Sequence, residues 1–143
     1  MRVEVVDQPE RWIVGVATRT CNADEMDPQR SRLGRLWQRA APDGEMVAVL
    51  TDYESDRHGE YTEVVGRPIT DLSDLPETLV AVRVPPGRYA RVAGEGEGPA
   101  AIMDAWRQVW LAEDGGELRR SYRTDFELWP AGGSPVLYLS VQA

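Results

Sequence analysis

Two short runs of the sequence place an acid beside an aromatic residue. The run TDYE at 51–54 returns as TDFE at 124–127, 73 residues later. Alternate side chains of a strand share a face, so Glu127 and Trp129 point the same way, and Glu54 takes the equivalent place in the first run. A carboxylate among aromatic rings suits a flat cation, because each ring adds about 0.5–2 kcal/mol of cation–π attraction. The alternative is that both glutamates are solvated strand residues paired with arginine.

Tyrosines extend this candidate site. The residues that we predict to bind a ligand are Glu127, Glu54, Trp129, Tyr61, Tyr89 and Tyr138. A glutamate in an apolar pocket has a raised pKa, which suits general acid–base chemistry, so Glu127 could activate water beside a tyrosine hydroxyl. Spacing does not show which tyrosine points inward, which leaves as candidates Tyr53, Tyr61, Tyr89 and Tyr138. If the protein is a hydrolase, we predict Glu127 and Tyr89 as its catalytic residues.

The composition excludes several other chemistries. All 16 basic residues are arginine, so Schiff-base catalysis, pyridoxal-type cofactors and a phosphate-loop lysine are excluded. The sequence has one histidine, His58, and one cysteine, Cys21, which leaves no imidazole cluster, disulfide or thiolate zinc cage. A nucleophile pair of Cys21 and His58 would rest on one residue of each type and is weakly supported. We therefore predict neither a metal nor a cofactor.

Charge and hydropathy narrow the choice of partners. The net charge of -8 argues against a nucleic-acid surface, which needs clustered positive charge. No apolar run approaches the roughly 20 residues of a membrane span, and the N-terminal segment has no apolar signal core. We therefore expect a cytoplasmic protein with no membrane or nucleic-acid partner. The expected partner is a small hydrophobic or cationic molecule, and the oligomeric state stays open.

The elements that must hold these residues alternate between strand and helix patterns. Runs rich in β-branched residues predict strands at 3–6, 12–18, 46–54, 61–69, 79–84, 89–95, 119–129 and 135–141. Asp27-Pro28 suits the start of a helix whose apolar face runs from Leu33 to Ala40. A second helix begins at Gly98 and carries an apolar face of its own.

The order of these elements indicates an internal duplication. Trp37 and Trp110, one in each helix, are 73 residues apart, the same offset as the TDYE and TDFE runs. We predict a single α+β domain, residues 1–143, made of duplicated strand–helix–strand–strand units at about 1–70 and 75–143. Its helices should cover one face of an antiparallel sheet, with a central ligand cleft between the halves.

This architecture predicts where the main side chains point. We expect the Phe126 side of the last hairpin to meet the second helix, which leaves Glu127 on the opposite face toward the cleft. Trp37 and Trp110 should lie in the core between helix and sheet. Glu54 precedes a polar turn, so it should lie at the cleft rim, and Glu127 should be the more buried acid.

Five motifs occur in a recognisable order along the chain. They are TRTCN at 18–22, LW at 36–37, LTDYESDRHGEYTEVVG at 50–66, PPGRY at 85–89 and FE at 126–127. Their order resembles that of the GyrI-like, or bacterial effector-binding domain, family over about residues 3–141. The resemblance implies a stand-alone form, without a DNA-binding domain, whose central cleft binds hydrophobic and often cationic small molecules. It also maps the family's buried, ligand-facing glutamate to Glu127.

Three functions follow from the residues and the resemblance. We favour binding of hydrophobic, cationic or aromatic small molecules in an acidic and aromatic cleft, for drug or effector sensing or for sequestration. The resemblance also implies a possible hydrolase of strained, cyclopropane-type genotoxic natural products that uses a cleft glutamate. The third alternative is a gyrase-inhibitor-like module that binds protein, against which the modest net charge and the many arginines argue.

Overall fold

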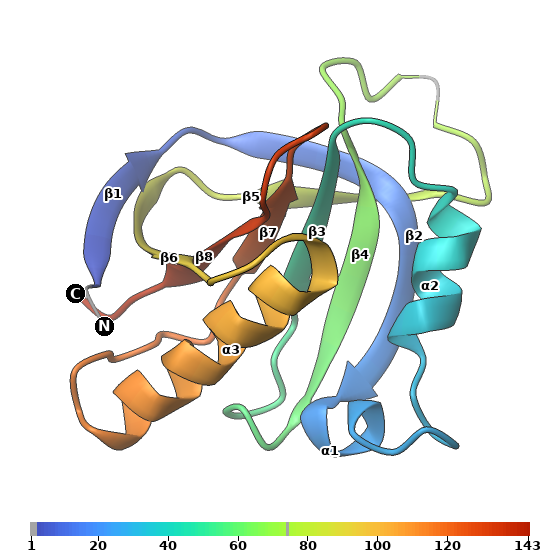
Figure 1. The fold of residues 1–143 in the computed structure, drawn as a ribbon. Helices are drawn as coiled ribbons and strands as arrows, with labels where there is room; N and C mark the ends of the chain where they lie inside the picture. Colours follow the sequence, from blue (N-terminus) through green and yellow to red (C-terminus); the bar gives the residue numbers. More distant parts are fainter. Residues whose placement is uncertain (1–2, 74) are drawn as a thin grey trace.

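The computed structural model describes residues 3–73 and 75–143, which form one curled antiparallel sheet with helices against it (Figure 1). The strands are β1 (Glu4–Gln8), β2 (Arg11–Cys21), β3 (Met46–Thr51), β4 (Glu60–Pro68), β5 (Val80–Val84), β6 (Gly87–Ala93), β7 (Asp125–Trp129) and β8 (Val136–Ser140). The helices are α1 (Asn22–Glu25), α2 (Leu33–Ala40) and α3 (Gly98–Asp114). The predicted α+β class is confirmed. In the described part of the chain, no helix combines the length and apolar character that crossing a membrane requires.

The order of the strands is internally symmetric. Across the sheet they run β1-β6-β8-β7-β3-β4-β2-β5, and exchanging β1–β4 with β5–β8 reverses this order while it preserves each pairing. Thr51 and Thr124 meet beside the central β3–β7 pair, with their hydroxyl oxygens 3.1 Å apart and 73 residues between them in sequence. This symmetry supports the proposed pseudo-repeats, while their limits at about 1–70 and 75–143 stay a prediction.

Paired glycines allow β2 and β4 to approach closely within the curled sheet. Gly15 of β2 lies opposite Gly66 of β4. A Cβ atom on Gly15 would lie 2.0 Å from the carbonyl oxygen of Val65, and one on Gly66 would lie 2.0 Å from that of Val14. A larger residue at either position would force the strands apart, so both positions require glycine.

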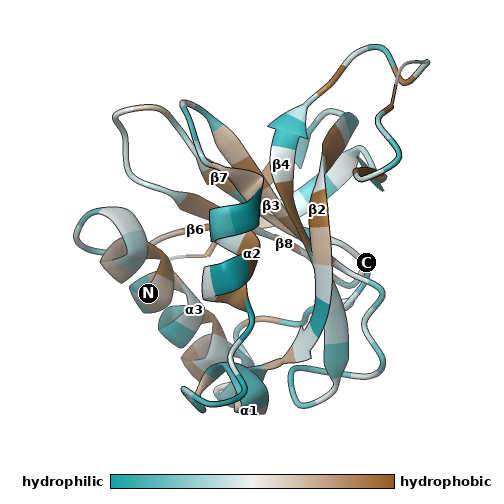
Figure 2. Cartoon of the chain, turned by 90° about the vertical axis from the view of Figure 1, so that its right-hand side faces the viewer, coloured by the Kyte–Doolittle hydropathy of each residue, from teal (hydrophilic) through white to brown (hydrophobic). Residues whose placement is uncertain are grey.

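The two longer helices cover the outer strands of one face of the sheet (Figures 1 and 2). Helix α3 packs on β6 and β8 through a cluster that includes Val92 and Val109. Helix α2 packs on β2 and β4 through Leu36 and Val65. The helices therefore flank the central strands β3 and β7. The opposite face of the sheet carries a third apolar cluster around Phe126.

The first helical region differs from the prediction. Asp27 begins a turn, because its carboxylate accepts a hydrogen bond from the backbone N–H of Gln29 at 2.9 Å. Helix α2 therefore begins at Leu33 and not at Asp27, and the short helix α1 precedes the turn. The carboxylate of Glu25 caps α2 by accepting hydrogen bonds from the backbone N–H groups of Arg32 at 3.0 Å and Leu33 at 3.1 Å.

Candidate functional site

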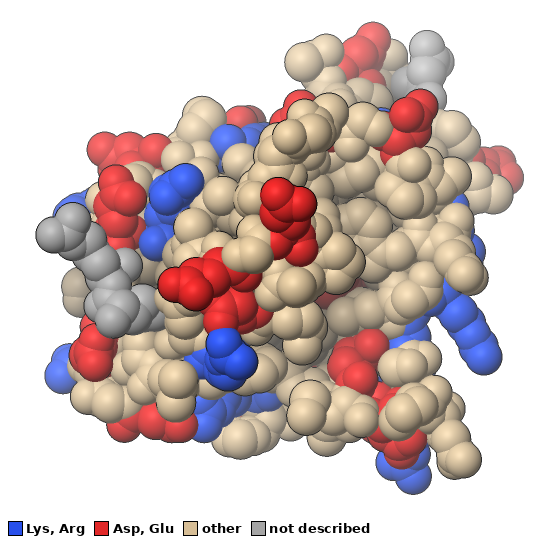
Figure 3. Space-filling view, in the orientation of Figure 1, with Lys and Arg blue, Asp and Glu red and all other residues tan. Residues whose placement is uncertain are grey.

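A cavity of about 540 Å³ lies between α2 and α3. Strands β3, β4 and β7 form its floor, α2 and α3 form its walls, and α1 and the β3–β4 loop border one end. Its floor residues are Leu50, Tyr61, Glu63, Glu127 and Trp129. Figure 3 shows mainly uncharged side chains in the area between the two helices, with acidic and basic side chains interspersed around it.

Aromatic side chains stand around the floor of the cavity. Trp37 of α2 contacts Trp129 edge to face, with ring centroids 5.1 Å apart. Trp106 and Trp110 of α3 line the cavity as well. The cavity therefore has aromatic walls on the sides of both helices.

Glu127 is held in one orientation by two indole groups. Its side chain is buried, and the residue is 7% exposed. Its Oε2 atom accepts a hydrogen bond from Trp106 Nε1 at 2.8 Å, and its Oε1 atom accepts one from Trp129 Nε1 at 2.9 Å. Burial raises the pKa of Glu127, and the two indole hydrogen bonds partly offset that rise.

Glu63 lies on the same cavity floor without such partners. The residue is 2% exposed and forms no hydrogen bond or ion pair with its side chain among residues 3–73 and 75–143. Burial raises the pKa of Glu63 well above its usual value, and the nearby Glu127 and Glu25 raise it further. A buried, unpaired carboxylate is unfavourable, so this position favours a protonated acid or an adjacent cation.

Two further ionisable groups line the cavity near Glu63. Glu25 of α1 is engaged by α2, and it also accepts a hydrogen bond from Thr20 Oγ1 at 2.5 Å. Tyr61 is 5% exposed on β4, and burial followed by the charge of Glu63 raises the pKa of its hydroxyl. Glu25 therefore stabilises the start of α2, while Tyr61 adds an aromatic face to the floor of the cavity.

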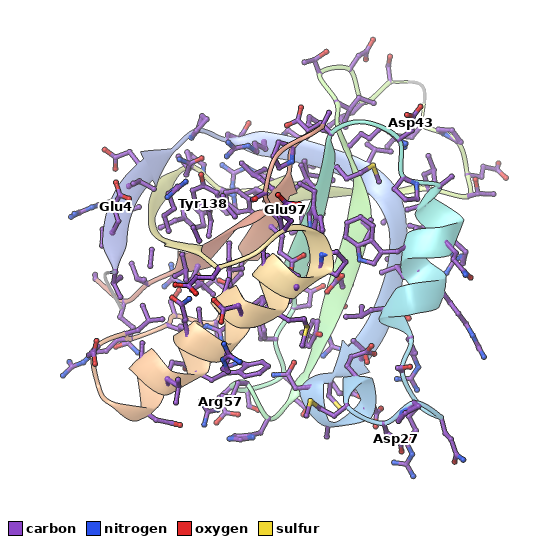
Figure 4. The ribbon with its side chains drawn as sticks, viewed as in Figure 1. Glu4, Asp27, Asp43, Arg57, Glu97 and Tyr138 are labelled. Atoms are coloured by element: carbon purple, nitrogen blue, oxygen red, sulfur yellow. The ribbon has the colours of Figure 1, made fainter. Side chains whose placement is uncertain are left out.

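The arginines that line the cavity have acidic partners of their own. Arg120 donates hydrogen bonds to Asp125 at 2.8 Å and to Glu113 at 3.2 Å. Asp125 also accepts a hydrogen bond from the Tyr53 hydroxyl at 2.6 Å, which fixes that ring at the cavity end. Arg57, near the last turns of α3, forms an ion pair with Asp114 and donates a hydrogen bond to the carbonyl oxygen of Trp110 (Figure 4). These built-in pairs leave Glu63 and Glu127 uncompensated by arginine.

Three of the predicted ligand-binding residues meet in this cavity. They are Tyr61, Glu127 and Trp129. Glu54 lies outside it, exposed in the loop that follows β3. Glu127 is therefore the more buried of the two predicted acids, as the polar turn after Glu54 indicated.

The other two predicted residues, Tyr89 and Tyr138, lie on the opposite face of the sheet. Tyr138 stacks on Phe126 with ring centroids 4.8 Å apart, and Tyr89 meets Phe126 edge on at 5.2 Å. The Tyr89 hydroxyl donates a hydrogen bond to the carbonyl oxygen of Pro85 at 2.5 Å. Both tyrosines therefore belong to the apolar cluster of that face and do not line the cavity.

The predicted alternation along β7 is correct, but its assignment to faces was wrong. Glu127 lies under the helices, where Trp106 of α3 reaches it, and Phe126 lies on the helix-free face. Helices and cavity share one face, because α2 and α3 stand apart and leave the centre open. Trp37 and Trp110 pack against the clusters between helix and sheet, as predicted, but both also border the cavity.

Sequence reasoning missed Glu63 and Arg120. Glu63 had a usable signal, because strand alternation puts it on the same face as Tyr61 and Val65, among buried residues. Arg120 had none, because its partners come from α3 and β7 and no local pattern links them.

Comparisons with known proteins agree with this fold. The model of the Cass2 family, described as integron-associated effector binding protein, matches residues 4–141. The integron cassette protein VCH_CASS2 of Vibrio cholerae shares 26% identity and superposes with a TM-score of 0.83, covering 98% of this chain and 95% of its own. SAV2435, solved bound to tetraphenylphosphonium, shares 13% identity and superposes with a TM-score of 0.74. The superposition covers 100% of this chain and 95% of SAV2435. YobU of Bacillus subtilis (strain 168) is 28% identical over 129 residues, 80% of this chain and 78% of YobU. The chain therefore belongs to the Cass2 family of integron-associated effector-binding proteins, in agreement with the GyrI-like order of its motifs.

Proposed function

We propose that this protein binds hydrophobic, aromatic cations in the cavity between α2 and α3, as a sensor of such effectors or to sequester them. The observation that carries the proposal is the pair of buried acids, Glu63 and Glu127, between aromatic walls. The arginines nearby are already paired with acids. A ligand cation therefore supplies the positive charge that these carboxyl groups lack.

The walls favour the same class of ligand. Trp37, Trp106, Trp110 and Trp129 line the cavity and present apolar ring surface. A cation over such a ring gains about 0.5–2 kcal/mol, and the gain is largest where water is excluded. An uncharged molecule of equal size would stack on the rings but would not supply a positive charge to the two acids. We therefore expect selectivity for charge as well as for shape.

The relatives support this proposal. The matched family is described as effector binding, and SAV2435, which shares the fold, was solved bound to tetraphenylphosphonium, a large aromatic cation. The cavity of the present chain, at about 540 Å³, lies within the usual range for a ligand of drug-like size.

A fluorescence titration tests the proposed function. The indoles of Trp106 and Trp129 lie at the site, so a bound cation should change tryptophan emission. We expect tetraphenylphosphonium to bind with a Kd on the order of micromolar. 10-Methylacridinium should bind at least about tenfold more tightly than its uncharged isostere 9-methylanthracene, the equivalent of about 1.4 kcal/mol. Equal affinity for the charged and uncharged molecules would refute the role given to the acids.

A hydrolytic role is the second candidate, and one observation favours it. Burial raises the pKa of the Glu63 and Glu127 carboxyl groups, and a raised carboxyl pKa suits general acid–base catalysis. Tyr61 lines the same cavity, whereas Tyr89 lies outside it. Incubation with a strained, cyclopropane-containing electrophile, followed by mass spectrometry, tests this role. Catalytic formation of a water adduct supports it, and binding without turnover argues for a receptor.

A further inference from the structure

The two buried acids of the cavity differ in their hydrogen-bond partners. We propose that Glu63 is the carboxyl that meets the ligand's positive charge and releases a proton as the cation enters, whereas Glu127 holds the indoles of Trp106 and Trp129 in place. This inference rests on the proposed function, because it assigns tasks to the acids within the same site. It also departs from the sequence prediction, which gave the ligand charge to Glu127.

The geometry of Glu127 suits a positioning residue. Each of its carboxyl oxygens accepts one indole N–H, at 2.8 Å from Trp106 and 2.9 Å from Trp129. These donors come from α3 and β7, so Glu127 ties a wall of the cavity to its floor. A move of the carboxyl toward a ligand would break these bonds and leave the buried N–H groups unpaired.

Glu63 is the acid that a ligand can neutralise without breaking any bond to the protein. It is 2% exposed, and no described residue donates a hydrogen bond to its carboxyl. The ionisable groups around it are Glu127 from β7, Glu25 from α1 and Tyr61 from β4. Cys21, at the end of β2, lies near Tyr61. These neighbours are acidic or neutral.

Neither the arginines that line the cavity nor the two longer helices provide a base that pairs with Glu63. Arg57 and Arg120 line the cavity, but Arg57 is paired with Asp114, and Arg120 with Glu113 and Asp125. The residues that α2 and α3 present to the cavity carry no charge. Among the described residues, Glu63 therefore faces two further acids from other elements and no unpaired base, an arrangement that favours its protonated form in the empty cavity.

The exchange balances in charge and atoms. The empty cavity holds Glu63 as a neutral carboxylic acid. When a permanent cation enters, the O–H bond breaks, the proton passes to solvent, and the carboxylate forms an ion pair with the ligand. One cation replaces one proton, so the cavity keeps its net charge. Affinity for a permanent cation then rises with pH, by at most about tenfold per pH unit, until Glu63 ionises in the empty protein.

Calorimetry tests the exchange, with tetraphenylphosphonium as a cation that cannot itself titrate. Titrations between pH 5 and 8, in buffers of different ionisation enthalpy, count the protons released per bound cation. We expect a maximum of about one proton for the natural chain. Glu63→Gln should release none, bind roughly 10- to 100-fold more weakly and lose its pH dependence. Glu127→Gln should still release a proton, at lower pH, because a neighbouring negative charge is gone.

A charged and uncharged ligand pair separates the two roles. We expect Glu127→Gln to weaken the binding of 10-methylacridinium and of 9-methylanthracene by similar factors, because it loosens the aromatic wall. Glu63→Gln should weaken only the binding of the cation. Glu54→Gln, in the exposed loop, is the matched control and should bind both as the natural chain does. Near-ultraviolet circular dichroism checks that each variant keeps its packing.

The failures of this inference and of the proposed function are distinguishable. Cation binding without proton release, or proton release that survives Glu63→Gln and vanishes in Glu127→Gln, would overturn the roles assigned here while the proposed function stands. Failure of the natural chain to bind either cation at any pH would end both.

Discussion

Replacement of Glu63 by methionine should stabilise the empty protein, by an amount that grows with pH. Methionine has a similar length and fills the same space without a charge. In the native chain the carboxyl is 2% exposed and lacks a partner among the described residues, and it lies near Glu127 and Glu25. Removal of a buried polar group that has no partner in the protein contributes at most about 1–3 kcal/mol, and the charge adds a pH-dependent part.

The sign of the pH dependence follows from the raised pKa of Glu63 in the folded state. Between the pKa of the unfolded chain, about 4.3, and that of the folded protein, the folded state binds more protons. The free energy of unfolding therefore falls as pH rises through this window, by at most about 1.4 kcal/mol per pH unit. From pH 5 to pH 7 the advantage of Glu63→Met should grow by up to about 3 kcal/mol.

Urea unfolding of both proteins at pH 5, 6 and 7 measures this difference. Acids far from Glu63 titrate alike in both proteins, so their contributions cancel when the two curves are subtracted. Glu54→Met, at an exposed position, is the control and should differ from the natural chain by the same small amount at each pH. A constant difference between Glu63→Met and the natural chain, or a difference that shrinks with pH, would show that Glu63 is not protonated in the folded protein.

Three further substitutions test the fold, each by urea unfolding at pH 7. Gly15→Ala should destabilise by about 3 kcal/mol, because its Cβ atom would lie 2.0 Å from the Val65 carbonyl oxygen; an unchanged midpoint would contradict this contact. Ala41→Gly should stabilise by about 0.5–1 kcal/mol, because the C-cap of α2 has a left-handed φ of 50°; a loss would refute that conformation. Asp125→Asn should destabilise by about 3–5 kcal/mol, because it removes the charge of a carboxylate that pairs with buried Arg120, and a neutral effect would mean that Glu113 suffices.

Local signals predicted most of the fold. Runs of β-branched residues mark the strands, and the Gly98-Pro99 start of α3 has a fixed physical basis, since proline suits the first turn of a helix. The predicted start of the first helix was wrong because two acids of this region could cap a helix. Asp27 bonds to its own turn, and the true cap of α2, Glu25, lies eight residues before Leu33 and belongs to another element. Such a contact leaves no local sequence signature.

The site was harder to predict, because it depends on where the helices leave space. Strand alternation separated Glu127 from Phe126, but it does not say which face the helices cover. That choice depends on the strand order, which places α2 and α3 over the outer strands and leaves β3 and β7 between them. The same uncertainty put Tyr89 and Tyr138 among the candidates and left out Glu63.

The strand order is symmetric, whereas the side chains that line the cavity are not. Exchange of the two halves preserves the strand order, and Thr51 meets Thr124 near the centre of the sheet. The two acids occupy positions that this exchange does not relate, because it maps β7 onto β3 and β4 onto β8. Glu127, from the second half, is bound by indoles of its own half, whereas Glu63, from the first half, receives no hydrogen bond from a described residue. The cavity is therefore asymmetric in its acids, although the strand order beneath it is symmetric. We therefore expect ligand choice to follow substitutions at Trp106, Trp129 and Glu63, while the strands beneath keep their order.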